Sequence, residues 1–382
     1  MSKPMVVVQS AKLAQEVLET QDKNICNRPL LTGGKRLSYG GLDVALSPYN
    51  EYLKEMKKIL IVHLLSSKKV DSFASIRQEE VSRLIQEVSS LSDASKVVNL
   101  SKLVLSFASS NSGRITFGKR YDDEEVLGSR YFSLLHEVEA MFVGFFFSDH
   151  FPLGGLIDKL SGQSSKLEKA FKEIDAVSEK IINDHLHTNK LQSERDDIVD
   201  VLLRLMNDTS FPFKLTKKHV KAILMNLFVG GANTTTAGVI WALTELIKNP
   251  IPMKKVQEEL RGAIQNKGCI LEGDLPMLKY FKAVVKETFR LHPPAPLLVP
   301  RETIQKINIE GYNILPKTTV IINAWAIQRD PEYWKDPEMF MPERFMHMGS
   351  SVELKAHDFM SMIPFGGGRR ICPAYNFGLC QP

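Results

Sequence analysis

The residues best suited to chemistry lie near the C-terminal end, in the segment PFGGGRRICPA at positions 364–374. Three consecutive glycines let a backbone turn tightly and approach a large ligand closely. Arg369 and Arg370 each carry a planar guanidinium that binds an anion through two hydrogen bonds. Cys372 follows them closely, and Pro373 stands where a helix could begin. This setting makes the cysteine a candidate metal ligand and the arginines candidate partners of an acidic group.

Several well-known kinds of site do not fit this segment. A phosphate-binding loop needs Lys-Ser or Lys-Thr after its glycines, and neither pair follows here. A dinucleotide site needs a surrounding βαβ unit, and a redox pair needs C-x-x-C spacing. What remains is a thiolate that ligates a cofactor with anionic groups, a description that fits haem with its iron and propionates. The alternative is a glycine-rich turn around an inert cysteine, the commoner role of a single cysteine.

Composition places the chain among ordinary globular proteins. It has 382 residues, of which 43% are hydrophobic and 24% charged, and a formal net charge of +5. That charge is too small to indicate a nucleic-acid partner, and we expect none. The four cysteines have neither zinc-ligand spacing nor the density of a disulfide framework, which favours a reducing compartment. The longest apolar run, 140–147, is far shorter than a membrane-spanning helix.

Helices dominate the elements that must position the cysteine segment. Apolar residues recur at helical spacing in three stretches: 73–91, 167–181 and 256–264. Residues 219–248 indicate one long helix, apolar on more than one face and so expected to cross the core. Residues 303–309 and 319–323 show strand patterns on either side of the turn Glu310-Gly311, which predicts a short hairpin or paired strands. The predicted fold class is therefore mainly α with a small β element.

Phe365, Gly368, Arg370 and Cys372 have the spacing F-x-x-G-x-R-x-C. This pattern resembles the haem-binding signature of the cytochrome P450 monooxygenases. Three further segments resemble signatures of that family and follow its order: GGANTT at 230–235, ETFR at 287–290 and PERF at 342–345. The resemblance covers essentially the whole chain and is strongest to the plant microsomal branch. It implies the cytochrome P450 fold, an all-α class with a long central I helix.

The resemblance implies that haem b, an iron protoporphyrin, is the cofactor. Cys372 would be the proximal ligand of its iron, and Arg370 and Arg301 would pair with its propionates. Phe365 and Gly368 belong to the same cofactor-binding signature. A thiolate ligand pushes electron density onto iron and so favours cleavage of the O–O bond.

The same resemblance assigns a structural triad and a set of substrate contacts. Glu287, Arg290 and Arg344 would form a buried ion triad that holds the haem-binding core and does no chemistry. A buried acid between two arginines costs free energy unless every donor is met. The candidate substrate contacts are Phe228, Ala232, Leu297, Leu298 and Val299.

Two neighbouring residues of the long helix would serve proton delivery. The family splits dioxygen with two protons brought through an acid–alcohol pair and water. Thr234 stands at the position of the alcohol, and Asn233 stands where the family has its acid. Because an amide cannot deliver a proton, we expect a slow relay through water alone, with leakage to peroxide.

The segment that resembles the family's C helix departs from its pattern. Leu53 and Lys57 replace a tryptophan and an arginine that reach a propionate in the family. Leu53 cannot donate a hydrogen bond, and Lys57 keeps the positive charge without the planar fork of arginine. Lys57 is therefore still a candidate cofactor contact, and we expect haem to be held less tightly.

The ends of the chain also depart from the plant branch, whose members begin with a membrane anchor and continue well beyond the cysteine. This chain ends at Pro382. We therefore expect residues 1–382 to be a single cytochrome P450 catalytic domain that lacks the N-terminal anchor and the C-terminal segment. The full-length protein would lie on the cytosolic face of the endoplasmic reticulum membrane.

The function implied is a monooxygenase that inserts one oxygen atom of dioxygen into a small plant secondary metabolite. Electrons would come from NADPH through a cytochrome P450 reductase, an acidic partner that a basic face could meet. The candidates for that face are Lys54, Lys57, Lys58 and Arg369. Two alternatives stay open: a truncated remnant that binds no haem, and a haem-thiolate isomerase or dehydratase that needs no reductase.

Overall fold

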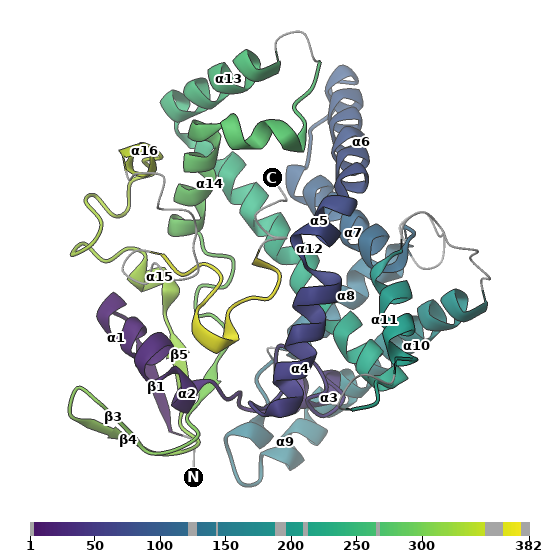
Figure 1. Ribbon diagram of the computed structural model, residues 1–382, viewed down its shortest axis with the longest axis vertical. Helices are drawn as coiled ribbons and strands as arrows, with labels where there is room; N and C mark the ends of the chain where they lie inside the picture. Colours follow the sequence, from purple (N-terminus) through teal and green to yellow (C-terminus); the bar gives the residue numbers. More distant parts are fainter. Residues whose placement is uncertain are drawn as a thin grey trace. The chain divides into compact units, whose positions relative to one another are not determined.

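Figure 1 shows the computed structural model of the chain. The structure describes residues 4–120, 128–142, 144–187, 196–208, 213–264, 268–347 and 362–375. The chain folds into two compact units. The first unit holds Arg28–Asn233, and the second holds Pro4–Asn27 and Thr234–Pro382. The expectation of a single catalytic domain stays a prediction.

The first unit is built from helices, as the sequence predicted. They are α3 (Thr32–Leu37), α4 (Glu51–Ile59), α5 (Ser67–Ser72), α6 (Ala74–Asp93), α7 (Leu100–Phe117), α8 (Gly128–Phe142), α9 (Gly154–Leu160), α10 (Gln163–His187) and α11 (Ile198–Met206). A π-helical turn, η2 (Leu60–Leu64), extends α4, and a 3-10 turn, η3 (Phe147–Asp149), precedes α9. Side-chain caps start three of these helices: Asn50 caps α4, Asn99 caps α7, and Asp197 forms a capping box with Asp200 at α11.

Helix α12 (Lys217–Lys248) is the long helix expected from the sequence. It passes from the first unit into the second after Asn233 and stays helical across Gly230 and Gly231. A Cβ on Gly231 would lie 2.9 Å from Ser112 Oγ of α7, so glycine allows close packing here. Among the described helices, α12 alone has the length and apolar composition to cross a membrane, a test that the core helix of a soluble protein also passes.

The second unit combines helices with two small sheets. Its remaining helical elements are α1 (Ala11–Gln15), η1 (Glu16–Thr20), α2 (Asp22–Ile25), α13 (Pro250–Ile264), η4 (Glu272–Met277), α14 (Lys279–Leu291), α15 (Ala324–Ile327), α16 (Arg344–His347) and η5 (Gly368–Arg370). In the larger sheet, β5 (Thr319–Ile322) lies between β1 (Met5–Val8), which is parallel to it, and β2 (Arg301–Glu302), which is antiparallel. Buried residues of β1, α1, β5 and α15 pack into one apolar core.

The strands near Glu310 pair differently from the expectation. Strands β3 (Ile307–Ile309) and β4 (Tyr312–Ile314) form a hairpin of their own. Glu310 and Gly311 have φ values of 46° and 85°, which belong to a tight two-residue turn. Such a turn pairs the residues directly beside it, so β4 occupies the place expected for 319–323. Strand β5 instead pairs with β1, near the N-terminus, which no local pattern indicates.

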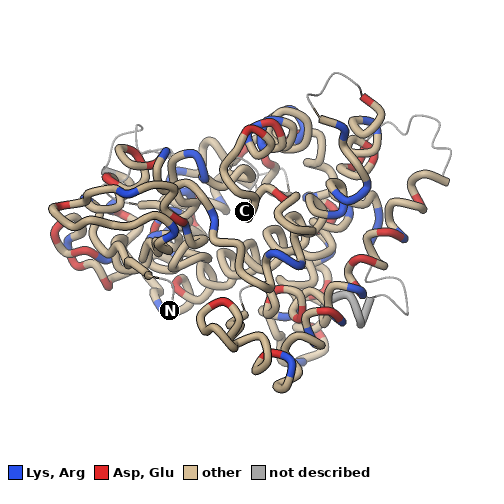
Figure 2. Tube along the Cα trace, turned by 90° about the horizontal axis from the view of Figure 1, so that it is seen from below, with Lys and Arg blue, Asp and Glu red and all other residues tan. Residues whose placement is uncertain are grey.

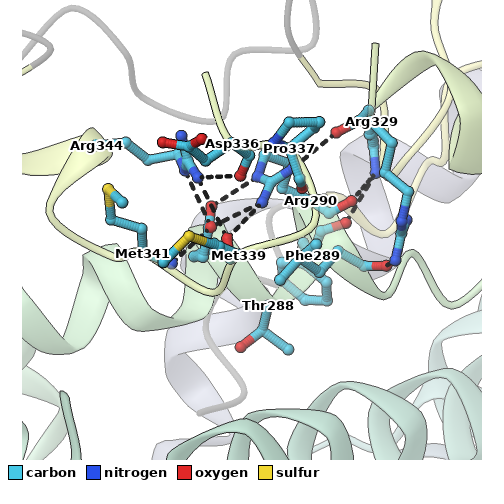
Figure 3. A network of polar contacts seen from close by, with 12 residues as sticks. Thr288, Phe289, Arg290, Arg329, Asp336, Pro337, Met339, Met341 and Arg344 are labelled. Carbon is cyan, nitrogen blue, oxygen red and sulfur yellow. Dashed lines mark hydrogen bonds and ion pairs between the residues drawn. The ribbon is translucent and has the colours of Figure 1, made fainter. Parts of the chain in front are cut away.

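A buried network of charges holds α14 to the chain that follows it (Figure 3). Glu287 and Arg290 of α14 have completely buried side chains, and Arg290 donates to both carboxylate oxygens of Glu287, at 2.7 and 2.8 Å. Arg344 Nε donates to Glu287 Oε1 at 3.0 Å. The backbone N–H of Met341 donates to the same oxygen at 2.9 Å. The structure thus brings together the three residues expected to form an ion triad.

The two arginines place further donors on backbone carbonyls (Figure 3). Arg290 Nη1 donates to the carbonyl oxygens of Gln328, at 3.0 Å, and Pro337, at 2.7 Å. Arg344 Nη1 donates to the carbonyl oxygen of Lys335 at 2.9 Å. Because the charges are both paired and hydrogen-bonded, the free-energy cost of removing them from water is offset.

Gln328 connects this network to the cysteine segment. Its buried amide nitrogen donates to the carbonyls of Phe289 and Arg290, both at 2.9 Å. Its Oε1 accepts the backbone N–H of Ile363 at 2.9 Å. The glutamine therefore fixes the start of the segment that leads to Cys372 relative to the end of α14.

Replacing Arg290 by alanine should lower the free energy of unfolding by about 3–5 kcal/mol, because it leaves the buried Glu287 short of one arginine. Equilibrium denaturation measures the loss, and haem content read in parallel should show apoprotein. Arg261→Ala on α13 is the matched control, since Arg261 is exposed, and should change stability by no more than about 0.5 kcal/mol. Equal stability and haem content in the two variants would contradict the structural role of Arg290.

Candidate functional site

The cysteine segment, residues 362–375, forms a tight loop in the second unit. The N–H of Gly366 donates to the carbonyl of Ile363 at 3.0 Å, and the N–H of Cys372 donates to that of Phe365 at 3.1 Å. The turn η5 lies between these two bonds and ends just before the cysteine. Cys372 is partly exposed. The loop therefore presents this residue without burying it in an apolar core.

Gly368 lets the loop pack closely against the N-terminal part of the second unit. Its φ is +61°, a backbone conformation that favours glycine. A Cβ at this position would lie 2.5 Å from the carbonyl oxygen of Leu18 and 2.5 Å from Oδ1 of Asp22. The sequence had suggested that these glycines admit a ligand. For Gly368 the structure shows a close approach to η1 and α2.

Asp22 is the buried carboxylate that holds the cysteine loop. Its side chain is only 3% exposed, and Oδ1 accepts a hydrogen bond from Arg301 Nη1 at 2.7 Å. Its Oδ2 accepts two more from Arg369, one from the backbone N–H and one from Nη1, both at 2.9 Å. These charge-assisted bonds join α2, β2 and the cysteine loop.

Both arginines expected to meet propionates are positioned by backbone carbonyls. Arg301 is buried, and its Nη2 donates to the carbonyl of Gly367 at 2.5 Å. Burial lowers the pKa of Arg301, and the neighbouring Asp22 acts in the opposite direction. Arg370 Nε donates to the carbonyl of Cys26 at 2.7 Å. These bonds fix both guanidinium groups relative to the loop that carries Cys372.

Phe365, the first residue of the signature, lies between two other rings. Its ring centroid is 5.7 Å from that of Phe289 and 5.2 Å from that of Tyr375, both in edge-to-face geometry. Phe289 belongs to α14, next to Arg290 of the ion triad. The aromatic contacts therefore attach the cysteine loop to α14, the helix that Gln328 also bonds.

The two proton-delivery candidates lie on α12. Asn233 Nδ2 donates a hydrogen bond to Oε2 of Glu139, which comes from α8. Thr234, the next residue of the helix, is exposed. Burial raises the pKa of Glu139 above its ordinary value. The sequence indicated an amide where the family has an acid, and the structure places a carboxyl group against that amide.

The five candidate substrate contacts divide between the two units. Phe228 and Ala232 of α12 are buried in the first unit. In the second unit, Leu297 is 48% and Val299 41% exposed. Leu298 packs against the apolar core of that unit and has a positive φ of 51°. Within either unit, the structure therefore brings only part of this set together.

The four residues expected to form a basic face divide in the same way. Lys54, Lys57 and Lys58 lie on α4 of the first unit, whereas Arg369 belongs to the second. Lys54 forms an exposed ion pair with Glu51 at 2.6 Å. Figure 2 shows Lys and Arg residues interspersed with Asp and Glu along the chain trace.

Sequence reasoning missed three side chains that organise these sites: Asp22, Gln328 and Glu139. Asp22 and Arg301 are 279 positions apart, and Glu139 and Asn233 are 94 apart. Motif spacing reports on residues that are neighbours along the chain, and these contacts are not of that kind. The one available signal was chemical: the Asn233 amide cannot deliver a proton, and from this only a relay through water was expected.

Gly368→Ala should destabilise the protein by about 1–3 kcal/mol, because the added methyl group meets backbone and carboxylate oxygens in a left-handed conformation. Thermal or urea unfolding measures the effect. Gly273→Ala is the matched control, since its added methyl group has open space. A Gly368→Ala variant as stable as Gly273→Ala would show that the loop does not pack against Asp22 as described.

Comparison with known proteins identifies the family of this chain. The family model for Cytochrome P450 matches residues 1–381. Among curated relatives, 6,7,8-trihydroxycoumarin synthase of Pastinaca sativa is 45% identical over 384 residues, covering 99% of this chain and 75% of the relative. Strychnine-11-hydroxylase of Strychnos nux-vomica is 42% identical over 380 residues, covering 99% and 74%.

Solved structures agree in fold. A zebrafish cytochrome P450 with progesterone superposes with a TM-score of 0.81 at 24% identity, covering 98% of this chain and 83% of that one. The expected fold, mainly α with small sheets and a long central helix, is thereby confirmed. Haem b is the cofactor of this family. The chain belongs to the cytochrome P450 family and is, like its relatives, a haem-dependent monooxygenase.

Proposed function

We propose that the protein inserts one oxygen atom of dioxygen into a small plant secondary metabolite, with electrons from NADPH delivered by a cytochrome P450 reductase. The observation that carries the proposal is the partly exposed Cys372 on a loop held by buried charges. The names of relatives support the substrate class, since they include a coumarin synthase and an alkaloid hydroxylase. We further propose the cytosolic face of the endoplasmic reticulum membrane as the place of action, where that reductase would be met.

The residues of the second unit fit haem in their chemistry. Cys372 would supply the soft thiolate ligand for iron. Thiolate-ligated haem iron would provide the chemistry of dioxygen activation. Arg370 and Arg301 would offer guanidinium groups to the propionates, and both are already positioned by carbonyl oxygens. Lys57, in the last turn of α4, is the further candidate for a propionate.

The remaining site residues are assigned to positioning and proton delivery. Asp22 holds Arg301 and the loop, and Phe365 packs the loop against α14. Thr234 would orient a water molecule or hydroxyl group for proton transfer. Phe228, Ala232 and the residues Leu297–Val299 would shape the substrate pocket.

The carbon monoxide difference spectrum tests the cysteine assignment. The wild-type protein should show the absorption band of thiolate-ligated haem, and Cys372→Ser should lose it because a serine hydroxyl is a poor ligand at neutral pH. Cys269→Ser is the matched control, since Cys269 is an exposed cysteine of the same unit, and should keep the band. A wild-type protein without the band would favour the remnant that binds no haem.

Reductant dependence tests the reaction class. Product from a coumarin or an alkaloid substrate should appear only when NADPH and the reductase are both present. Asn233 gives a reason to include the alternative, because an isomerase or dehydratase does not need the family's acid. One relative, 2-methylbutanal oxime monooxygenase of Manihot esculenta, is 42% identical, so an aldoxime belongs in the panel. Turnover of a hydroperoxide or aldoxime without reductant would overturn the monooxygenase assignment for this protein.

A further inference from the structure

The helix position before Thr234 lacks the acid that a proton relay needs. In the structure, the carboxyl group of Glu139 lies beside that position. Asn233 occupies that position, and an amide forms hydrogen bonds without releasing a proton. Glu139 of α8 lies directly against it, accepting a hydrogen bond from Asn233 Nδ2 across 94 positions of sequence. Both residues belong to the first unit. A carboxyl group therefore stands one hydrogen bond away from the site of the missing acid.

The surroundings of Glu139 favour a carboxyl group that holds a proton. Burial is the largest influence and raises its pKa, because the charged form loses contact with water. The hydrogen bond from Asn233 and the charge of His136, one turn earlier on α8, act in the opposite direction and only partly offset burial. A raised pKa moves a carboxylic acid toward the range in which it exchanges a proton with water at the working pH.

We propose that Glu139 is the proton-holding residue for oxygen activation in this protein, and that Asn233 positions it beside α12 in place of the missing acid. The inference rests on the proposed monooxygenase function. In each turnover the carboxyl group would pass a proton to an adjacent water molecule and regain one from solvent. The electrons come from NADPH through the reductase, so Glu139 ends each cycle unchanged.

The alternative role for Glu139 is purely structural, a hydrogen bond that joins α8 to α12. Glu139→Gln separates the two roles, because glutamine keeps a carbonyl oxygen for Asn233 and has no acidic proton. Glu137→Gln, two residues away on α8, is the matched control and should behave as the wild type. The readouts are product formed per NADPH consumed and hydrogen peroxide released.

For Glu139→Gln we expect product per NADPH to fall about tenfold, a modest part of what a positioned acid supplies. Peroxide release should rise to match. The double variant Glu139→Gln/Asn233→Asp moves the acid onto α12 itself and should recover coupling. Coupling in Glu139→Gln equal to that in Glu137→Gln, or no recovery in the double variant, would overturn the proposal.

A second readout does not depend on turnover. Infrared difference spectra between wild type and Glu139→Gln isolate the Glu139 carboxyl band, and its titration should lie above the ordinary glutamate value of about 4.3. Asn233→Ala should move it further upward, because the lost hydrogen bond had favoured the charged form. Titration at the ordinary value would contradict the inference even in an active enzyme. A wild-type protein without the thiolate-haem band would instead defeat the proposed function and leave the titration unaffected.

Discussion

Asp22 is a carboxylate removed from water, and the cysteine loop depends on how its charge is met. An isolated buried charge is costly, so the chain around it must supply donors. Arg301 and Arg369 do so from positions 279 and 347 residues away. The pairing ties the N-terminal helix α2 to strand β2 and to the loop that presents Cys372. Gly368 completes the arrangement, because any side chain there would displace the carboxylate.

The same loop is attached to α14 at its other end. Gln328 bonds the end of that helix and the backbone of Ile363, while Phe365 packs on Phe289. Helix α14 is in turn held by the ion triad of Glu287, whose arginines place their donors on carbonyl oxygens (Figure 3). Two buried charge networks therefore anchor the cysteine loop, and the acids at their centres, Asp22 and Glu287, are assigned a structural role. Their role is to hold the partly exposed Cys372 in a defined position.

The proton supply proposed for this protein has a different physical basis from that of the family signature. Asn233 replaces an acid on α12, which by itself predicts a weak relay. The structure pairs that amide with Glu139, whose pKa is raised by burial. On this proposal, the acid stands on α8 and the hydrogen bond between Asn233 and Glu139 keeps it beside α12.

The sequence by itself determined the mainly α class, several of the helices, the cysteine signature and the family. Each of these follows from residues close together along the chain: apolar spacing for α12, a glycine in the hairpin turn, and the interval from Phe365 to Cys372. Only the tertiary structure decided the partners, including Asp22 for Arg301, Glu139 for Asn233, and β1 for β5. The physical reason is that a buried charge or a strand edge forms hydrogen bonds with the groups that packing places beside it. Packing can bring together segments that are hundreds of residues apart in the sequence. The periodicity of apolar residues along the chain does not indicate these long-range contacts.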